Sequence, residues 1–129
     1  MISEIFVKFI DLKDMRYKTL GDYGMGMNRM WFSVANMSRP AYMLAILCHE
    51  LVEYFLCIRD QIDEKIITAF DISFETGRCH GEPGDDPDCP YRSQHQAATS
   101  VERAVIAAFD EKWTEYEDEC VAMFRNSKG

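Results

Sequence analysis

The feature that most constrains this fold is an apolar stretch over 41–58 in which only His49, Glu50 and Glu53 are polar. Ser38 and Arg39 followed by Pro40 form a helix start, and the pattern predicts a helix over 40–59. A helix that is apolar on all sides is buried in a core or spans a membrane. Two carboxylates and an imidazole in mid-span are costly in a bilayer, so we expect the central helix of a globular domain.

The three polar residues form an H-E-x-x-E pattern that points to a buried divalent metal ion. A buried carboxylate without a partner costs several kcal/mol or stays protonated, and a cation removes this cost. His49 and Glu53 are four residues apart and share a helix face, while Glu50 is placed to act as general base on a water held by the metal. The alternative is a solvated groove, or ion pairs with Arg59, Arg92 or Arg103.

A second predicted helix, over 90–109, carries further candidate ligands. An apolar stripe of Ala98, Val101, Val105, Ala108 and Phe109 defines its inner face. At 100° per residue, His95 and Glu102 fall at one edge of this stripe and should face the first helix. His49, Glu53 and His95 then form a set of three ligands that leaves one coordination position open for water. Zinc is the first choice of metal for this set, and manganese or iron are the alternatives. Glu102 is either a fourth ligand or a partner that orients an imidazole.

The remaining elements predict a single α+β domain over 1–129. Residues 4–12 and 29–37 have strand composition, and the glycine-rich 19–28 between them predicts a long loop that joins an antiparallel β-ribbon. Asp63 is the expected N-cap of a helix ending near residue 75, and residues 76–90 predict a loop. A last helix is expected with Asp110 as its cap and an apolar face of Trp113, Tyr116, Cys120 and Phe124. We therefore expect the ribbon to pack on about four helices, in an arrangement compatible with a zincin-like core.

Charge and composition exclude some classes of function. The chain has 129 residues and a formal charge of −8, which disfavours binding to nucleic acid or anionic lipid. The basic cluster Lys8, Lys13, Arg16 and Lys18 is interleaved with Asp11 and Asp14. The segment over 1–10 lacks the pattern of an export signal, so a cytoplasmic location is expected.

The cysteines and the acidic loop leave several interpretations open. Cys48 and Cys57 would lie on opposite faces of one helix and cannot pair. Cys79 and Cys89 are suited either to a disulfide or, with His80, to a small metal site, although reduced thiols are the expectation for a cytoplasmic protein. The loop acids Glu82, Asp85, Asp86 and Asp88 lack the spacing of an EF-hand, and we interpret the loop as a lid or rim.

The chain resembles a group of small bacterial and phage proteins with an HExxE motif. The resemblance covers "RYKTLGDY" (16–23), "HELVE" (49–53), "EPGDDPDCPYRSQH" (82–95) and "ATSVER" (98–103). It implies that Tyr17, Asp22, Asp85 and Tyr91 line the pocket of the candidate ligands. Asp71, beside a predicted buried face, is a weaker candidate for the same pocket.

Two strands followed by an HExx helix also resemble the minimal zincin metalloprotease core. In that core an edge strand aligns the substrate above the metal. The chain departs from the zincin pattern because Glu53 replaces the second histidine and His95 lies on another helix.

Three functions are compatible with these patterns. The first is a zinc-dependent hydrolase acting on a carbonyl or phosphoryl centre, with His49, Glu53 and His95 as ligands and Glu50 as base. The second is a non-catalytic interaction protein that binds a protein partner and holds a structural metal or a buried polar network. The third is a redox-active two-metal centre bridged by Glu50, Glu53 and Glu102. The long apolar helix also leaves room for a homodimer interface.

Overall fold

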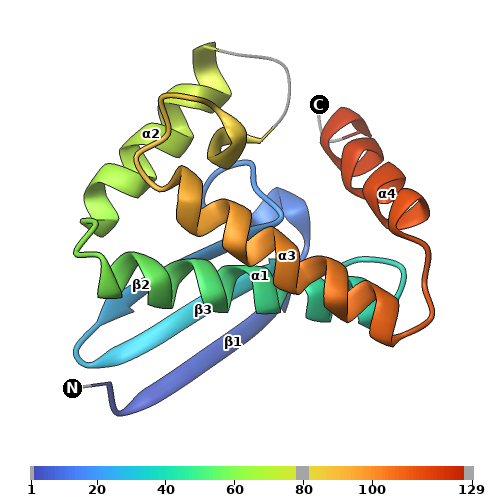
Figure 1. The fold of residues 1–129 in the computed structure, drawn as a ribbon, viewed down its shortest axis with the longest axis horizontal. Helices are drawn as coiled ribbons and strands as arrows, with labels where there is room; N and C mark the ends of the chain where they lie inside the picture. Colours follow the sequence, from blue (N-terminus) through green and yellow to red (C-terminus); the bar gives the residue numbers. More distant parts are fainter. Residues whose placement is uncertain (1, 78–81, 127–129) are drawn as a thin grey trace.

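The computed structural model describes residues 2–77 and 82–126 and has an α+β architecture, as predicted (Figure 1). The strands are β1 (Glu4–Ile10), β2 (Gly21–Gly26) and β3 (Arg29–Ala35). The helices are α1 (Pro40–Arg59), α2 (Glu64–Gly77), α3 (Arg92–Ala108) and α4 (Trp113–Asn126). Two short 3-10 helices, η1 (Leu12–Asp14) and η2 (Pro83–Asp85), lie in the connections.

The sheet is mixed, which corrects the predicted antiparallel ribbon. Its strand order is β1-β3-β2, with β1 parallel to β3 and β2 antiparallel to β3. The glycine-rich stretch predicted as a loop contains β2, so the chain reverses once more before β3 begins. That extra reversal makes the two strands predicted from composition run in the same direction.

The turn between β2 and β3 explains how this glycine-rich stretch forms a hairpin. Gly26 pairs with Arg29, so the loop has two residues, Met27 and Asn28, with φ values of 51° and 65°. Left-handed backbone at both positions is the requirement of a type I′ turn, and asparagine tolerates it well. Within β2, a Cβ at Gly24 would lie 2.4 Å from the Trp31 ring, so this glycine permits the ring to cross the strand.

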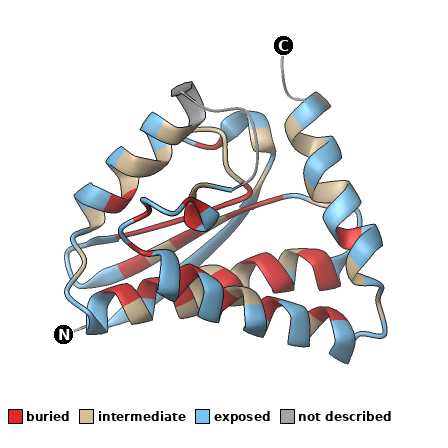
Figure 2. Ribbon diagram, turned by 45° about the horizontal axis from the view of Figure 1, so that its top comes forward, coloured by how far each residue is buried: buried red, intermediate tan, exposed pale blue. Residues whose placement is uncertain are grey.

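α1 is the central helix of the domain, as predicted. It packs on β2 and β3 on one side and along α3 on another, and Figure 2 shows buried residues along both helices. By length and composition α1 is also apolar enough to cross a membrane. One such helix is weak evidence for a span, because a core helix passes the same test. The predicted absence of a membrane partner therefore stays a prediction.

The helix boundaries and caps agree with the predictions except near Asp110. Asp63 caps α2 by accepting a hydrogen bond from the Lys65 N–H at 2.8 Å. α4 begins at Trp113, and Asp110 instead adopts a left-handed φ of 59° in the turn after α3. Its backbone N–H closes the end of α3 by donating to the Ala107 carbonyl, so Asp110 terminates one helix rather than starting the next.

The predicted apolar face is correct for α4 and only partly correct for α3. The predicted face of α4 packs on a core formed with β3, α1 and α3. Of the stripe predicted for α3, however, Val101, Ala108 and Phe109 are exposed. The buried positions of α3 are Gln94, His95, Ala98, Glu102 and Ile106. The buried stripe of α3 is therefore centred on polar residues, because the face of α1 that it meets is polar as well.

Candidate metal centre

Two helices bring three buried polar residues to one point. α1 contributes His49 and Glu53 from adjacent turns of one face, and α3 contributes His95 from its first turn. The three side chains are only 5–6% exposed. The predicted convergence of the two helices at these residues is confirmed, and together they form a buried group that could hold a metal ion.

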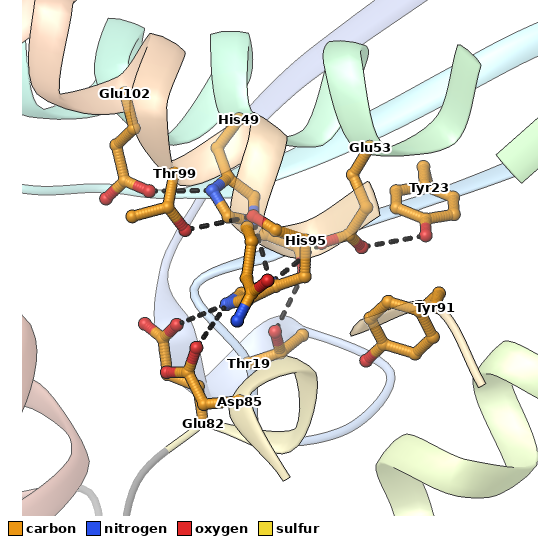
Figure 3. A network of polar contacts seen from close by, with 12 residues as sticks. Thr19, Tyr23, His49, Glu53, Glu82, Asp85, Tyr91, His95, Thr99 and Glu102 are labelled. Atoms are coloured by element: carbon orange, nitrogen blue, oxygen red, sulfur yellow. Dashed lines mark hydrogen bonds and ion pairs between the residues drawn. The ribbon is translucent and has the colours of Figure 1, made fainter. Parts of the chain in front are cut away.

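The geometry of the group is a compact triangle of two nitrogens and one oxygen (Figure 3). His49 Nε2 lies 3.0 Å from Glu53 Oε2 and 3.1 Å from His95 Nδ1, and the third side, from His95 Nδ1 to Glu53 Oε2, is 2.9 Å. A tetrahedral zinc ion with bonds of about 2.0–2.1 Å separates its ligand atoms by about 3.3 Å. An ion therefore needs an expansion of only a few tenths of an ångström.

The outward-facing nitrogen of each imidazole lies against a carboxylate. His49 Nδ1 is 2.7 Å from Glu102 Oε1, and His95 Nε2 is 2.9 Å from Glu82 Oε2. Both nitrogens are buried and neither makes a well-directed hydrogen bond, although the carboxylates are within reach. Metal-binding histidines commonly direct their second nitrogen to a carboxylate in this way. Glu102 therefore lies against the outer nitrogen of His49 and is not one of the three atoms of the triangle.

Glu53 is held from its other oxygen by a tyrosine. The Tyr23 hydroxyl, from β2, donates to Glu53 Oε1 at 2.8 Å, which leaves Oε2 for the triangle. Tyr23 itself is fixed by stacking on Tyr54 of α1, with ring centroids 4.3 Å apart. The sheet therefore sets the orientation of a carboxylate that a helix supplies.

The electrostatics of the triangle favour a cation at its centre. Burial lowers the pKa of His49, but Glu102 and Glu53 outweigh it and raise this pKa to about 11. Burial likewise opposes a charge on His95, and Glu53 and Glu82 raise its pKa to about 10. Burial raises the pKa of Glu53, yet hydrogen bonds from His49 and His95 lower it to about 2. The carboxylates thus attract positive charge into the site.

Protonation of the two histidines alone is a poor way to supply positive charge to this site. If both imidazoles were doubly protonated, N–H groups on His49 Nε2 and His95 Nδ1 would face each other across 3.1 Å. Two donors in contact repel, because neither offers a lone pair to the other. A divalent ion supplies the same charge and accepts lone pairs from all three atoms, which removes this conflict.

Glu50 lies beside the triangle, on the side of β2. A Cβ at Gly21 would be 2.5 Å from Glu50 Oε1, so the strand approaches this side chain closely because it has a glycine there. Burial, and then repulsion from Glu53, raises the pKa of Glu50. Within 2–77 and 82–126 the Glu50 carboxylate has no hydrogen-bond donor. It is therefore a carboxyl group with raised proton affinity and unused acceptors, as a general base requires.

A second glycine permits the position of His95. A Cβ at Gly84 of η2 would lie 2.1 Å from His95 Cγ, so the imidazole ring lies directly on the backbone of this 3-10 helix. η2 also contributes Asp85, whose Oδ1 is 3.4 Å from His95 Nε2. The segment predicted as a lid or rim is therefore in contact with the candidate metal centre.

A cavity of about 820 Å³ opens on the centre. His49, Glu50, Glu53, His95 and Glu102 line it, together with all five predicted pocket residues, Tyr17, Asp22, Asp71, Asp85 and Tyr91. This volume is in the range of small-molecule sites. The structure therefore brings every sequence-predicted site residue to one cavity.

A tyrosine pair and a carboxylate form a further part of the cavity wall. Asp71, on α2, accepts hydrogen bonds from Tyr17 Oη at 3.0 Å and from Tyr91 Oη. Burial raises the pKa of Asp71 to about 6 in spite of these two bonds. Asp22 is instead paired with Arg16, with 2.5 Å between its Oδ2 and the guanidinium Nε.

Sequence reasoning missed four residues of this site, Gly21, Tyr23, Glu82 and Gly84. The two glycines occur in stretches that read as loops, and a close approach of another chain segment leaves no local signal in the sequence. All four residues lie inside the stretches that carry the resemblance, 16–23 and 82–95, and that was the available signal. Cys79 and His80 lie outside the described residues, and the four described cysteines, Cys48, Cys57, Cys89 and Cys120, are free thiols.

Comparisons of the chain with protein-family models, curated proteins and solved structures found no match. The resemblance to small HExxE proteins and to the zincin core therefore stays a prediction. The assignment of function rests on the geometry of the site.

Proposed function

We propose that this protein is a zinc-dependent hydrolase whose ion is held by His49, Glu53 and His95. The observation that carries the proposal is the buried triangle of two imidazole nitrogens and one carboxylate oxygen, with sides of 2.9–3.1 Å. A second partner holds each of the three side chains from outside the triangle. Two histidines and a glutamate with a free coordination position are a ligand set of catalytic zinc sites, and manganese or iron are the alternatives.

The chain's own residues supply the remaining chemistry. Zinc held by these three residues would polarise a carbonyl or phosphoryl oxygen and would lower the pKa of a bound water to about 7. Glu50 takes the proton of the attacking water, because its raised pKa and unused acceptors favour proton uptake. Tyr17 and Tyr91 line the cavity and donate their hydroxyl protons to Asp71, so their oxygens can accept hydrogen bonds from donor groups of the substrate. Peptide, amide, ester and phosphoester bonds are the substrate classes to test.

Metal content is the first test. Protein purified without chelator should contain about one equivalent of metal by elemental analysis, and a Glu53→Ala/His95→Ala double variant should contain none. Glu117→Gln, which changes a carboxylate lining the same cavity outside the triangle, is the matched control and should retain the metal. If the folded parent contains no metal and takes up no added zinc, manganese or iron, the proposal is wrong.

Ligand-linked stability gives an independent readout. Free zinc at 100 times its Kd stabilises a folded protein by about 2.7 kcal/mol. For a chain of this length that corresponds to a rise in Tm of about 10 °C. The double variant should show no such rise. An equal rise in parent and double variant would indicate that zinc binds elsewhere.

Glu50→Gln separates binding from chemistry. The amide keeps the shape of the side chain but cannot accept a proton, so the variant should keep its metal and lose turnover. Full turnover by Glu50→Gln on a substrate that the parent hydrolyses would exclude Glu50 as the base. Stoichiometric metal together with no hydrolysis across the four substrate classes would favour the non-catalytic alternative, in which the ion stabilises the fold of an interaction protein.

A further inference from the structure

β1 is an edge strand with apolar side chains exposed on both faces. Phe6 is 44% exposed on one face, and Ile5, Val7 and Phe9 are 48%, 38% and 48% exposed on the other. Edge strands are normally protected by charges, prolines, bulges or a covering segment, because their free backbone groups pair readily with another strand. β1 has seven residues, of which only Glu4 and Lys8 are charged, and it has no proline. It therefore has the properties of a strand that pairs in solution.

The pairing with β3 shows that one face of β1 belongs to the core side of the sheet. Ile5, Val7 and Phe9 are in register with Met30, Phe32 and Val34, which are fully buried under the helices. Cross-strand neighbours point to the same side of a sheet. The helical layer covers this side at β2 and β3 but leaves it open at β1 (Figure 1).

α1 extends this apolar surface. Leu44, Phe55 and Ile58 are 38%, 44% and 42% exposed. At 100° per residue they share one stripe on the side of α1 opposite His49 and Glu53. The latter residues face the cavity beside β2, so the stripe lies on the flank toward β1. The inner face of β1 and this stripe of α1 therefore both expose apolar side chains, and exposed apolar patches of this kind mark protein interfaces.

We propose that two copies of this chain pair through β1, antiparallel and two-fold symmetric about Phe6, into one six-stranded sheet. This register places Glu4 opposite Lys8 of the partner subunit, twice by symmetry, and Ile5 opposite Val7 of the partner subunit. Phe6 then meets its own copy at the axis. The strand is thus self-complementary in charge and in hydrophobicity. A second copy of the chain is therefore the partner that best fits the free edge of β1.

The other edge of the sheet lacks this property. At β2 the backbone N–H of Met25 donates to Glu64 Oε2 of α2 at 3.2 Å, so a helix already covers that edge. Growth of the sheet is therefore expected at β1 alone. Such pairing ends in a closed dimer, because each copy has one free edge.

Sedimentation velocity over a range of protein concentrations tests the dimer. The parent should sediment as a dimer in the micromolar range, and Phe6→Lys, which brings two lysines together at the axis, should sediment as a monomer with unchanged metal content. Ile66→Lys, at a 53% exposed apolar position on α2, is the matched control and should remain dimeric. A parent that stays monomeric, or a Phe6→Lys variant that stays dimeric, would overturn the proposal.

Charge exchange tests the register without relying on one disruptive variant. Lys8→Glu opposes like charges in both symmetric pairs, and so does Glu4→Lys, so each alone should dimerise at least about tenfold more weakly. An equimolar mixture restores both attractive pairs and should recover the parent affinity as a heterodimer. If the mixture dissociates as readily as either variant alone, the antiparallel pairing about Phe6 is wrong.

Discussion

Gly84→Ala is the substitution that tests most directly whether η2 fixes the position of His95. A Cβ added at Gly84 would lie 2.1 Å from His95 Cγ and 2.3 Å from Nδ1, the atom that completes the triangle. Ordinary van der Waals contact begins near 3.4 Å, so the ring must retreat by about 1.3 Å if η2 stays in place.

The size of this displacement sets the expected loss of affinity. Metal–ligand bonds tolerate about 0.2 Å of error, so a shift of about 1.3 Å removes His95 from the coordination sphere. Changes to the groups that merely orient a ligand already weaken metal binding by about 10–100-fold. We therefore expect Gly84→Ala to weaken zinc binding by at least about 100-fold, or about 2.7 kcal/mol.

Competition titration with a zinc chelator of known affinity measures this change. Gly26→Ala is the matched control, because a Cβ at Gly26 meets nothing within 4 Å, and it should bind zinc like the parent. Circular dichroism should show both variants folded at the temperature of the titration. Equal zinc affinity of Gly84→Ala and the parent would refute the reasoning, since it would mean that η2 yields instead of the imidazole.

Three further predictions concern the partners of the site. Glu102→Gln removes the negative charge beside His49 Nδ1, so zinc binding should weaken by about 10–100-fold in the same titration; unchanged affinity would argue against an orienting role. Asp71 has its pKa raised to about 6 from 3.8, so its ionisation costs stability as the pH rises through this range. Urea denaturation should therefore find Asp71→Asn gaining stability relative to the parent from about pH 4 to about pH 7, and a constant difference would contradict this. Gly21→Ala should displace the Glu50 side chain, which would lower turnover while elemental analysis finds the metal content unchanged; unaltered turnover would show that Glu50 is not held there.

The predictions that succeeded rest on local periodicity and on the cost of burying charge. The apolar run over 41–58 predicted α1 correctly, because few structures other than a core helix accommodate such a run. The polar residues inside it required partners, and the seven-residue spacing of His95 and Glu102 placed both on the buried side of α3. Helix geometry and electrostatics therefore indicated the candidate site before any tertiary information.

The strand order and pairing of the sheet could not be predicted in this way. The glycines of 21–26 lower strand propensity, and the formation of β2 depends on pairing with β3 and on the close approaches of Trp31 and Glu50 to its glycines. The parallel pairing of β1 with β3 follows from that additional strand. Strand pairing is a property of segments distant in sequence, so a reading of each segment alone does not reveal it.

The sequence by itself predicted a buried helix with a histidine and two glutamates that need charged or hydrogen-bonding partners. Only the tertiary structure decided which atoms meet, with Nε2 of His49 and Nδ1 of His95 turned inward, and Glu102 and Glu82 against the opposite nitrogens. The physical reason is that side-chain composition and helical spacing fix the face on which a group lies. The choice among its atoms depends on contacts made across the fold.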